Sequence, residues 1–174
     1  DGPQNYMGSL YRAVPVGIKW PNDLMVRGRK LGGVLIERVA SSGSRVALIG
    51  IGINVRQREF PPELADGATS LLREGADLDR LDLLVGLVVA LDEALGEPSE
   101  RLLADYLGRD ALRGREATFG TPTGEITGTV LQAHPVDGIA IEVPGGTVTL
   151  PVATTTVLAW RDDDGRLVDK RGTR

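Results

Sequence analysis

The chain has 174 residues, of which 41% are hydrophobic and 25% are charged, and its formal net charge is -4. This composition is typical of globular proteins that bury their own core, and the acidic balance argues against sequence-independent binding to nucleic acid. The sequence contains no cysteine, which excludes disulfides, thiolate metal sites and a cysteine nucleophile.

Targeting signals are absent from the sequence. No apolar stretch approaches the ~20 residues that a membrane-spanning helix needs, and no signal peptide is evident. We therefore expect a soluble protein with a cytoplasmic location. The sequence begins with Asp1 rather than Met, which predicts that these residues are a piece of a longer chain.

Four apolar runs near the start of the chain predict neighbouring antiparallel strands, at residues 14–20, 23–26, 30–40 and 45–55. Turn-forming residues separate them, "RGRK" after the second run and "SSGS" after the third. The longer runs are nearly continuous rather than alternating, so we expect the central strands to be covered on both faces.

Two helices are predicted after a polar loop. Residues 81–95 carry apolar residues at spacings of three and four, with Asp79 as the N-cap and Gly96 as the stop. Residues 98–110 fit a shorter helix with Ser99 as its cap. Both patterns indicate core packing rather than direct chemistry.

Short strands separated by "TPTG", "PVDG" and "PGG" follow Leu112 and predict a small SH3-like β-barrel over residues 112–161. Residues 162–174 are charged and poor in apolar residues, so we expect a disordered tail. The predicted fold class is α+β: a partial mixed or antiparallel sheet with packed helices over residues 1–111, followed by the barrel. His134 is interpreted as a loop residue of the barrel.

Polar side chains stand at the ends and turns of the first predicted strands, namely Lys19, Asn22, Asp23 and Lys30. Side chains from different strands can converge on one ligand at such positions. The glycine pair Gly32 and Gly33 removes two side chains from an apolar strand. Such a gap indicates either a ligand slot or a close crossing of another chain segment.

The stretch "GIGIN", residues 50–54, is similar to part of a dinucleotide fingerprint. No glycine stands three residues after Gly52 and no helix pattern begins there, so the fingerprint is excluded. No stretch fits a Walker-type phosphate loop either. A nucleotide would therefore have to bind without these loops.

The order "KWPNDL", "KLGGVLIE", "IGIGINV" and "ATSL", followed by two helices and a small barrel, resembles the biotin protein ligases. The resemblance covers residues 17–160 and implies a class II synthetase-like fold of the biotin/lipoate ligase type. It also implies that ATP adenylates biotin, with Mg2+, and that the biotinyl group passes to a lysine of a biotin carboxyl carrier protein or domain.

The resemblance implies a role for each candidate residue. Lys30 would approach the biotin carboxylate and the phosphate that it attacks, and would be the catalytic residue. The remaining expectations are Asn22 and Asp23 near the nucleotide phosphates with Asp23 as magnesium ligand, Asn54 near the adenylate, Lys19 at the edge of the site, and Gly32 and Gly33 against the biotin ring.

The family also carries a Ser-Thr-Asn stretch and a Gly-Arg-Gly-Arg loop upstream of "KWPND", and neither is found here. We therefore expect the C-terminal part of a ligase, inactive and aggregation-prone by itself. A lipoate-type ligase and a non-catalytic module that binds the carrier stay open as alternatives. A homodimer is compatible with the resemblance, and DNA binding would require an N-terminal domain that this sequence lacks.

Overall fold

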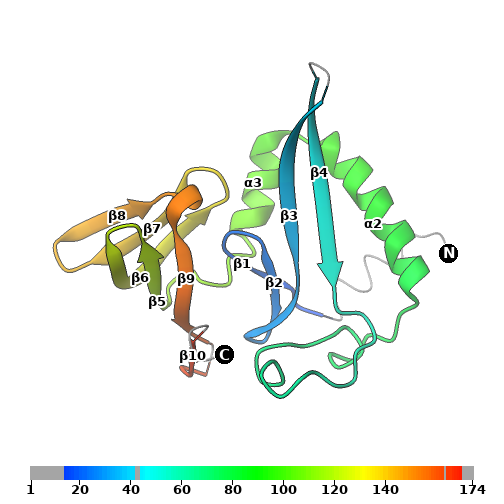
Figure 1. Ribbon diagram of the computed structural model, residues 1–174, viewed down its shortest axis with the longest axis horizontal. Helices are drawn as coiled ribbons and strands as arrows, with labels where there is room; N and C mark the ends of the chain where they lie inside the picture. Colours follow the sequence, from blue (N-terminus) through cyan, green and yellow to red (C-terminus); the bar gives the residue numbers. More distant parts are fainter. Residues whose placement is uncertain (1–13, 42–43, 163, 170–174) are drawn as a thin grey trace.

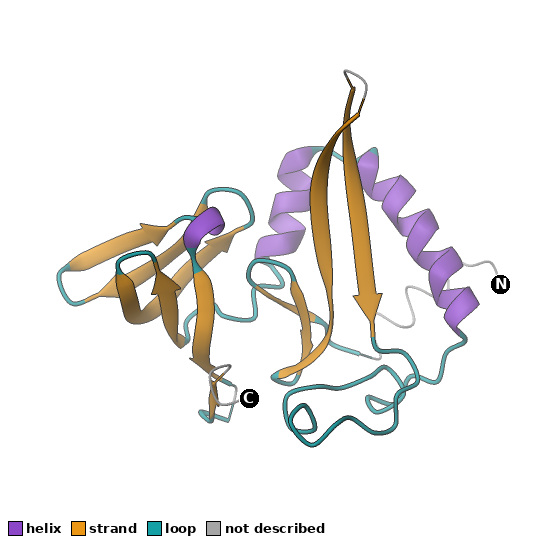
Figure 2. Ribbon diagram, viewed as in Figure 1, coloured by secondary structure: helices purple, strands orange, loops and turns teal. Residues whose placement is uncertain are grey.

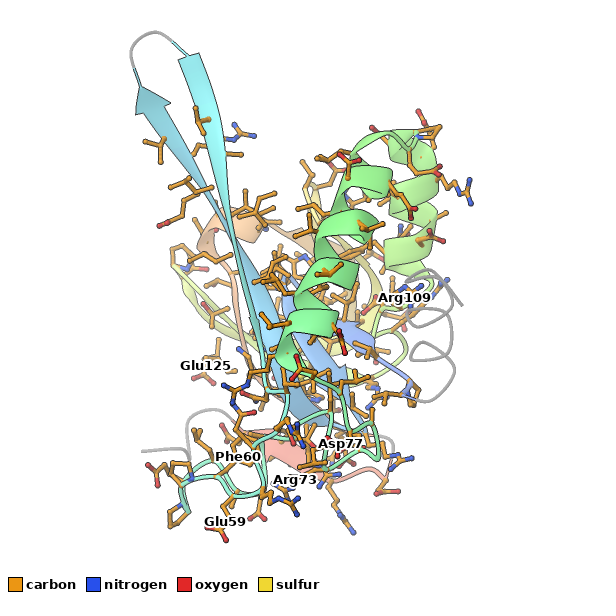
Figure 3. The ribbon with its side chains drawn as sticks, turned by 90° about the vertical axis from the view of Figure 1, so that its right-hand side faces the viewer. Glu59, Phe60, Arg73, Asp77, Arg109 and Glu125 are labelled. Carbon is orange, nitrogen blue, oxygen red and sulfur yellow. The ribbon has the colours of Figure 1, made fainter. Side chains whose placement is uncertain are left out.

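The computed structural model describes residues 14–41, 44–162 and 164–169. The strands of this part form two antiparallel sheets, and two helices lie beside the longer strands of the first sheet (Figure 1). Figure 2 shows that strands predominate over helices. Within the described residues, no helix has both the length and the apolar character required to cross a membrane.

The first sheet has the strand order β1-β2-β3-β4. Its strands are β1 Gly17–Lys19, β2 Asp23–Val26, β3 Arg29–Ser41 and β4 Ser44–Ile53. The turn between β2 and β3 has left-handed backbone at Arg27 (φ 47°) and Gly28 (φ 76°), and glycine tolerates this region without a steric cost. The predicted strands of this region are therefore confirmed, with a shorter first strand.

The β3–β4 hairpin departs from the prediction that its strands are covered on both faces. It projects beyond the helices in Figure 1, and large apolar side chains along it are between 40% and 62% exposed: Leu35, Ile36, Val39, Val46, Leu48, Ile49 and Ile51. A continuous apolar run indicates that a strand needs cover on both faces, but the run does not say which segment supplies it. Within the described residues, no segment buries these apolar side chains of β3 and β4.

Helix α2 (Arg80–Leu95) and helix α3 (Ser99–Leu107) confirm the two predicted helices. The Asp79 side chain accepts a hydrogen bond from the Leu81 N–H at 2.7 Å and caps α2, as predicted. The cap of α3 is instead Pro98, which provides no side-chain hydrogen bond. Helix α2 buries only Leu83 and Gly86, so the expected core packing of its apolar stripe is not observed.

The second sheet has the strand order β10-β9-β5-β6-β7-β8 and follows a segment that links it to α3. Its strands are β5 Glu116–Thr121, β6 Gly124–His134, β7 Gly138–Val143, β8 Gly146–Leu150, β9 Thr156–Arg161 and β10 Leu167–Asp169. The 3-10 helix η1 (Val152–Thr154) lies between β8 and β9. The prediction of a disordered tail does not hold for β10, which pairs with β9, while residue 163 and residues 170–174 lie outside the described residues.

The core of the second sheet includes residues from outside that sheet. Trp20, Met25 and Leu112 pack in one cluster with Phe119, Ile139 and other side chains of the second sheet. The Trp20 indole is fully buried, and its Nε1–H donates to the His134 carbonyl oxygen at 2.9 Å. The β1–β2 hairpin is therefore fixed on the second sheet by packing and by a directed hydrogen bond.

Candidate functional site

The polar residues of the β1–β2 turn and the start of β3 form an ion triad. The Lys19 ammonium contacts Asp23 Oδ2 at 2.5 Å, and the Lys30 ammonium contacts Asp23 Oδ1 at 2.5 Å. The exposed fraction is 3% for the Lys19 side chain, 10% for that of Asp23 and 47% for that of Lys30. One carboxylate thus lies between a buried cation and a half-exposed cation.

Strand pairing explains why these groups meet. Asp23 lies opposite Gly33, and Met25 lies opposite Lys30, with a register shift between the two pairs. The shift is a β-bulge, and an extra residue on one strand changes the direction in which the neighbouring side chains point. Lys30 therefore lies opposite Met25, which is two residues after Asp23 on β2. From this position its side chain reaches the Asp23 carboxylate.

Asn22 fixes the other side of the turn. Its side-chain Nδ2 donates to the Val34 carbonyl oxygen at 2.6 Å, and its own carbonyl oxygen accepts from the Val34 N–H at 3.0 Å. This double contact extends the pairing of β2 and β3 by one residue. The Asn22–Asp23 turn is consequently held against the strand that carries Lys30.

An open cavity of about 440 Å³ adjoins the triad. It is lined by Asn22, Asp23, Lys30, Gly33, Val34, Leu35, Gly50, Ile51 and Gly52. A Cβ atom on Gly33 would lie 3.3 Å from the Asn22 carbonyl oxygen and 3.4 Å from Asp23 Oδ1. A Cβ on Gly52 would meet nothing within 4 Å and would enter open space. These glycines keep the floor of the cavity free of side chains.

Gly32 does not line this cavity. A Cβ atom there would lie 2.1 Å from the Gly52 carbonyl oxygen, so Gly32 permits the close approach of β3 and β4. Gly33 lines the cavity, whereas Gly32 lies where β3 and β4 approach each other closely. Gly32 is not among the residues that line the cavity, and its expected contact with biotin stays a prediction.

Asn54 also lies outside the cavity lining. Its side-chain Nδ2 donates to the Thr69 carbonyl oxygen at 3.0 Å. The Thr69 N–H in turn donates to the Lys30 carbonyl oxygen at 2.9 Å, and the Lys30 N–H donates to the Gly67 carbonyl oxygen at 2.7 Å. Asn54 therefore helps to hold the "ATSL" segment alongside the backbone of Lys30.

Lys19 is placed away from the cavity that Lys30 lines. It is 2% exposed, and its ammonium lies 5.2 Å from the ring centroid of Trp160, which belongs to β9. It lines a separate cleft of about 390 Å³ between the sheets, and this cleft shares no lining residue with the Lys30 cavity. Lys19 is therefore buried, and its expected position at the edge of a nucleotide site stays a prediction.

Several polar residues near the site were missed by sequence reasoning. Thr69 is fully buried, and its hydroxyl donates to Glu74 Oε1, which also accepts from Arg29 at 2.9 Å. The Tyr106 hydroxyl donates to the Pro21 carbonyl oxygen at 3.0 Å. Burial, and secondarily the charge of Asp110, raises the pKa of Tyr106 to about 12. Of these residues, only Thr69 belongs to a motif of the family resemblance, "ATSL".

Asp110 ties α3 to the second sheet. One carboxylate oxygen accepts from the Leu112 N–H at 2.9 Å and the other from the Ala133 N–H at 3.1 Å. Burial raises the pKa of Asp110, and these backbone hydrogen bonds oppose the rise because they favour the charged form. Its role is structural, since both oxygens are used to join chain segments.

The triad carries two positive charges and one negative charge, so its net charge is positive and its exposed member is Lys30. Such a site suits an anionic ligand. Magnesium fits it less well. Both oxygens of Asp23 are bonded to ammonium groups, and the described residues contain no group of three or more acidic or histidine side chains that could hold a metal ion.

The sequence matches the pattern of the biotin/lipoate A/B protein ligase family over residues 6–54. The biotin–acetyl-CoA-carboxylase ligase of Mycobacterium tuberculosis is 34% identical over 146 residues, which are 79% of this chain and 53% of that protein. The bifunctional ligase/repressor BirA of Escherichia coli is 38% identical over 96 residues, which are 54% of this chain and 30% of that protein.

Solved structures agree with the sequence matches. The apo biotin protein ligase from Aquifex aeolicus has a TM-score of 0.72 and 26% identity, covering 89% of this chain and 70% of that one. The same ligase in complex with biotin and ATP has a TM-score of 0.71 and 27% identity, covering 89% and 66%.

Fold and site together define a protein similar to the biotin/lipoate ligase class. Within that class, the resemblance to the biotin protein ligases predicted from the motifs is confirmed by these curated relatives and solved structures. The chain spans about half of the mycobacterial ligase and less than a third of the Escherichia coli protein.

Proposed function

We propose that this chain forms part of a biotin protein ligase, which adenylates biotin with ATP and transfers the biotinyl group to a lysine of a carrier domain. The observation that carries the proposal is the Lys30 ammonium, held by Asp23 at the edge of a cavity whose floor is cleared by Gly33. The similarity to biotin protein ligases, one of them in complex with biotin and ATP, supports the choice of substrates.

Adenylation brings two anions together, and this is the barrier that Lys30 lowers. The biotin carboxylate attacks the α-phosphorus of ATP, an acyl–phosphate bond forms, and the bond to pyrophosphate breaks. Two unit negative charges at ~4 Å repel each other by about 4 kcal/mol at an effective dielectric constant of 20. A lysine ammonium is a compact cation on a flexible stem, so it can stabilise charge on the carboxylate and then on the phosphate.

The second reaction needs positioning rather than a protein nucleophile. The carrier lysine amine attacks the acyl carbon of the mixed anhydride, an amide bond forms, and AMP leaves. We propose that Asn22, exposed beside the cavity, lies near the nucleotide phosphates. Asn54 would act through the segment that it holds beside Lys30. Magnesium, when bound with ATP, would neutralise phosphate charge.

The proposal is tested by biotin-dependent exchange of radiolabelled pyrophosphate into ATP. In the protein that contains this chain, we expect Lys30→Ala to lower the exchange rate by about 10²–10³-fold, the loss seen when one transition-state donor is removed. The matched control is Arg101→Ala, which removes a cation that is 69% exposed on α3. Equal exchange by wild type and Lys30→Ala would refute the role of Lys30.

Lipoate is the alternative substrate, because the matching family includes lipoate ligases. Isothermal titration calorimetry with biotin and with lipoate separates the two. We expect heat of binding with biotin only, since the "KWPND" and "KLGG" motifs are those of biotin ligases. Saturable binding of lipoate without biotin binding would assign the chain to the lipoate ligases.

We also propose the finer architecture expected from the sequence, with the second sheet as an SH3-like domain and a cytoplasmic location for the protein. The Lys30 cavity is open, and the β3–β4 strands beside it carry exposed apolar side chains. For this reason we expect the 174 residues by themselves to give no pyrophosphate exchange. Robust exchange by the isolated chain would show that the described residues suffice.

A further inference from the structure

We propose that Lys19 and Trp160 position the catalytic lysine: the Trp160 ring seats Lys19, Lys19 fixes the Asp23 carboxylate, and Asp23 holds Lys30. Lys19 then has no contact with the nucleotide, and Asp23 is an anchor for two lysines rather than a magnesium ligand. The catalytic part of this inference rests on the proposed adenylation, whereas the structural coupling can be measured without it.

The contact between Lys19 and the Trp160 ring is buried. The Lys19 side chain is 3% exposed, and Trp160 is 5% exposed within the core of the second sheet. Their separation of 5.2 Å lies within the range in which a ring face attracts a cation, and the attraction grows when the cation is removed from water. A buried lysine that contacts a carboxylate and an aromatic ring has a fixed position.

The Asp23 carboxylate links Lys19 to Lys30. Asp23 is 10% exposed at its side chain, and each of its oxygens contacts a different ammonium group. A displacement of Lys19 therefore turns the carboxylate and moves the oxygen that Lys30 contacts. Lys30 lines the cavity where biotin would bind, while Lys19 and Trp160 line the separate cleft between the sheets. The second sheet can thereby influence Lys30 without touching the proposed substrates.

Nuclear magnetic resonance of lysine side chains tests the coupling independently of activity. The lysines of this sequence are Lys19, Lys30 and Lys170, and Lys→Arg variants assign their Cε–Hε signals. We expect Trp160→Leu to remove the upfield ring-current shift of Lys19 and also to change the signals of Lys30. The matched control is Phe119→Leu, another buried aromatic residue of the second sheet. Lys30 signals that are identical in wild type and Trp160→Leu would overturn the proposal.

Steady-state kinetics provide the second measurement. We expect Trp160→Leu to lower the kcat of adenylation about tenfold while the KM values for ATP and biotin stay within about twofold. Phe119→Leu should keep the wild-type kcat even where it lowers the melting temperature similarly. An increase in the KM for ATP with unchanged kcat would place Lys19 at the nucleotide and overturn its positioning role.

A magnesium titration separates anchor from ligand at Asp23. We expect Asp23→Asn to lower kcat but to leave the half-saturating magnesium concentration within about twofold of wild type. A rise of tenfold or more would make Asp23 a magnesium ligand and refute this part of the inference. If the wild-type protein that contains this chain showed no adenylation at all, the proposed function would fail, while the lysine signals would still decide whether Trp160 is coupled to Lys30.

Discussion

Replacement of Trp20 by alanine tests whether the "KWPND" turn and the second sheet form one cooperative unit. The Trp20 side chain is fully buried in the core of the second sheet and donates to the His134 carbonyl oxygen. Truncating a buried tryptophan costs about 3–5 kcal/mol, and losing its hydrogen bond adds about 1 kcal/mol. We therefore expect Trp20→Ala to lower the free energy of unfolding by at least about 4 kcal/mol.

Differential scanning calorimetry measures this loss. For a unit of this size, 1 kcal/mol shifts the melting temperature by roughly 2–4 °C, so Trp20→Ala should lower it by about 8–16 °C. Trp20→Phe keeps part of the aromatic packing but removes the donor and fills less volume, so its shift should be smaller than that of Trp20→Ala. The control Leu81→Ala changes a side chain that is 70% exposed and should shift it little.

The outcome that contradicts this reasoning is specific. If Trp20→Ala shifted the transition of the second sheet by less than about 2 °C, Trp20 would not belong energetically to its core. The geometric cluster that includes Trp20, Met25 and Leu112 would then overstate the coupling. The positioning inference would be weakened too, because Lys19 is the neighbour of Trp20 in the same hairpin.

Three further predictions concern glycines, a tyrosine and the apolar hairpin. Gly32→Ala should unfold the protein, because its Cβ would meet the Gly52 carbonyl oxygen at 2.1 Å, whereas Gly33→Ala should stay folded by circular dichroism and weaken biotin binding in calorimetry. Burial raises the pKa of Tyr106 to about 12, so its contribution to the free energy of unfolding should be complete below pH 10 and fall between about pH 10 and 12. Urea unfolding over this pH range measures the fall. An equal fall in the stability of Tyr106→Phe would contradict the prediction. The Ile36 and Ile49 pair, 62% and 40% exposed, should promote self-association of the isolated chain, and serine at both positions should reduce the mass measured by light scattering.

Local sequence patterns predicted most of the secondary structure. The α2 helix was expected at residues 81–95 and is observed at Arg80–Leu95, because capping and apolar spacing are local signals. The convergence of Asp23, Lys30 and Gly33 could also be anticipated, since they lie at the ends of strands that pair through a tight turn. These features depend on residues close together in the chain.

Features that depend on distant pairing could not be predicted. Lys19 is buried beside Trp160, and no local pattern links the two residues. The role of Gly32 depends on the approach of Gly52 from β4. The strand β10 forms because Asp162 accepts hydrogen bonds from the N–H groups of Asp164 and Arg166 and reverses the chain, a turn that composition alone does not show.

The concentration of polar groups in "KWPND" follows from its position between two surfaces. Lys19 and Trp20 are buried against the second sheet, whereas Asn22 and Asp23 line the open cavity. Asp23 belongs to both sides, because its two oxygens contact a buried and a half-exposed lysine. The two faces of this short turn therefore make different contacts, one with the second sheet and one with the cavity.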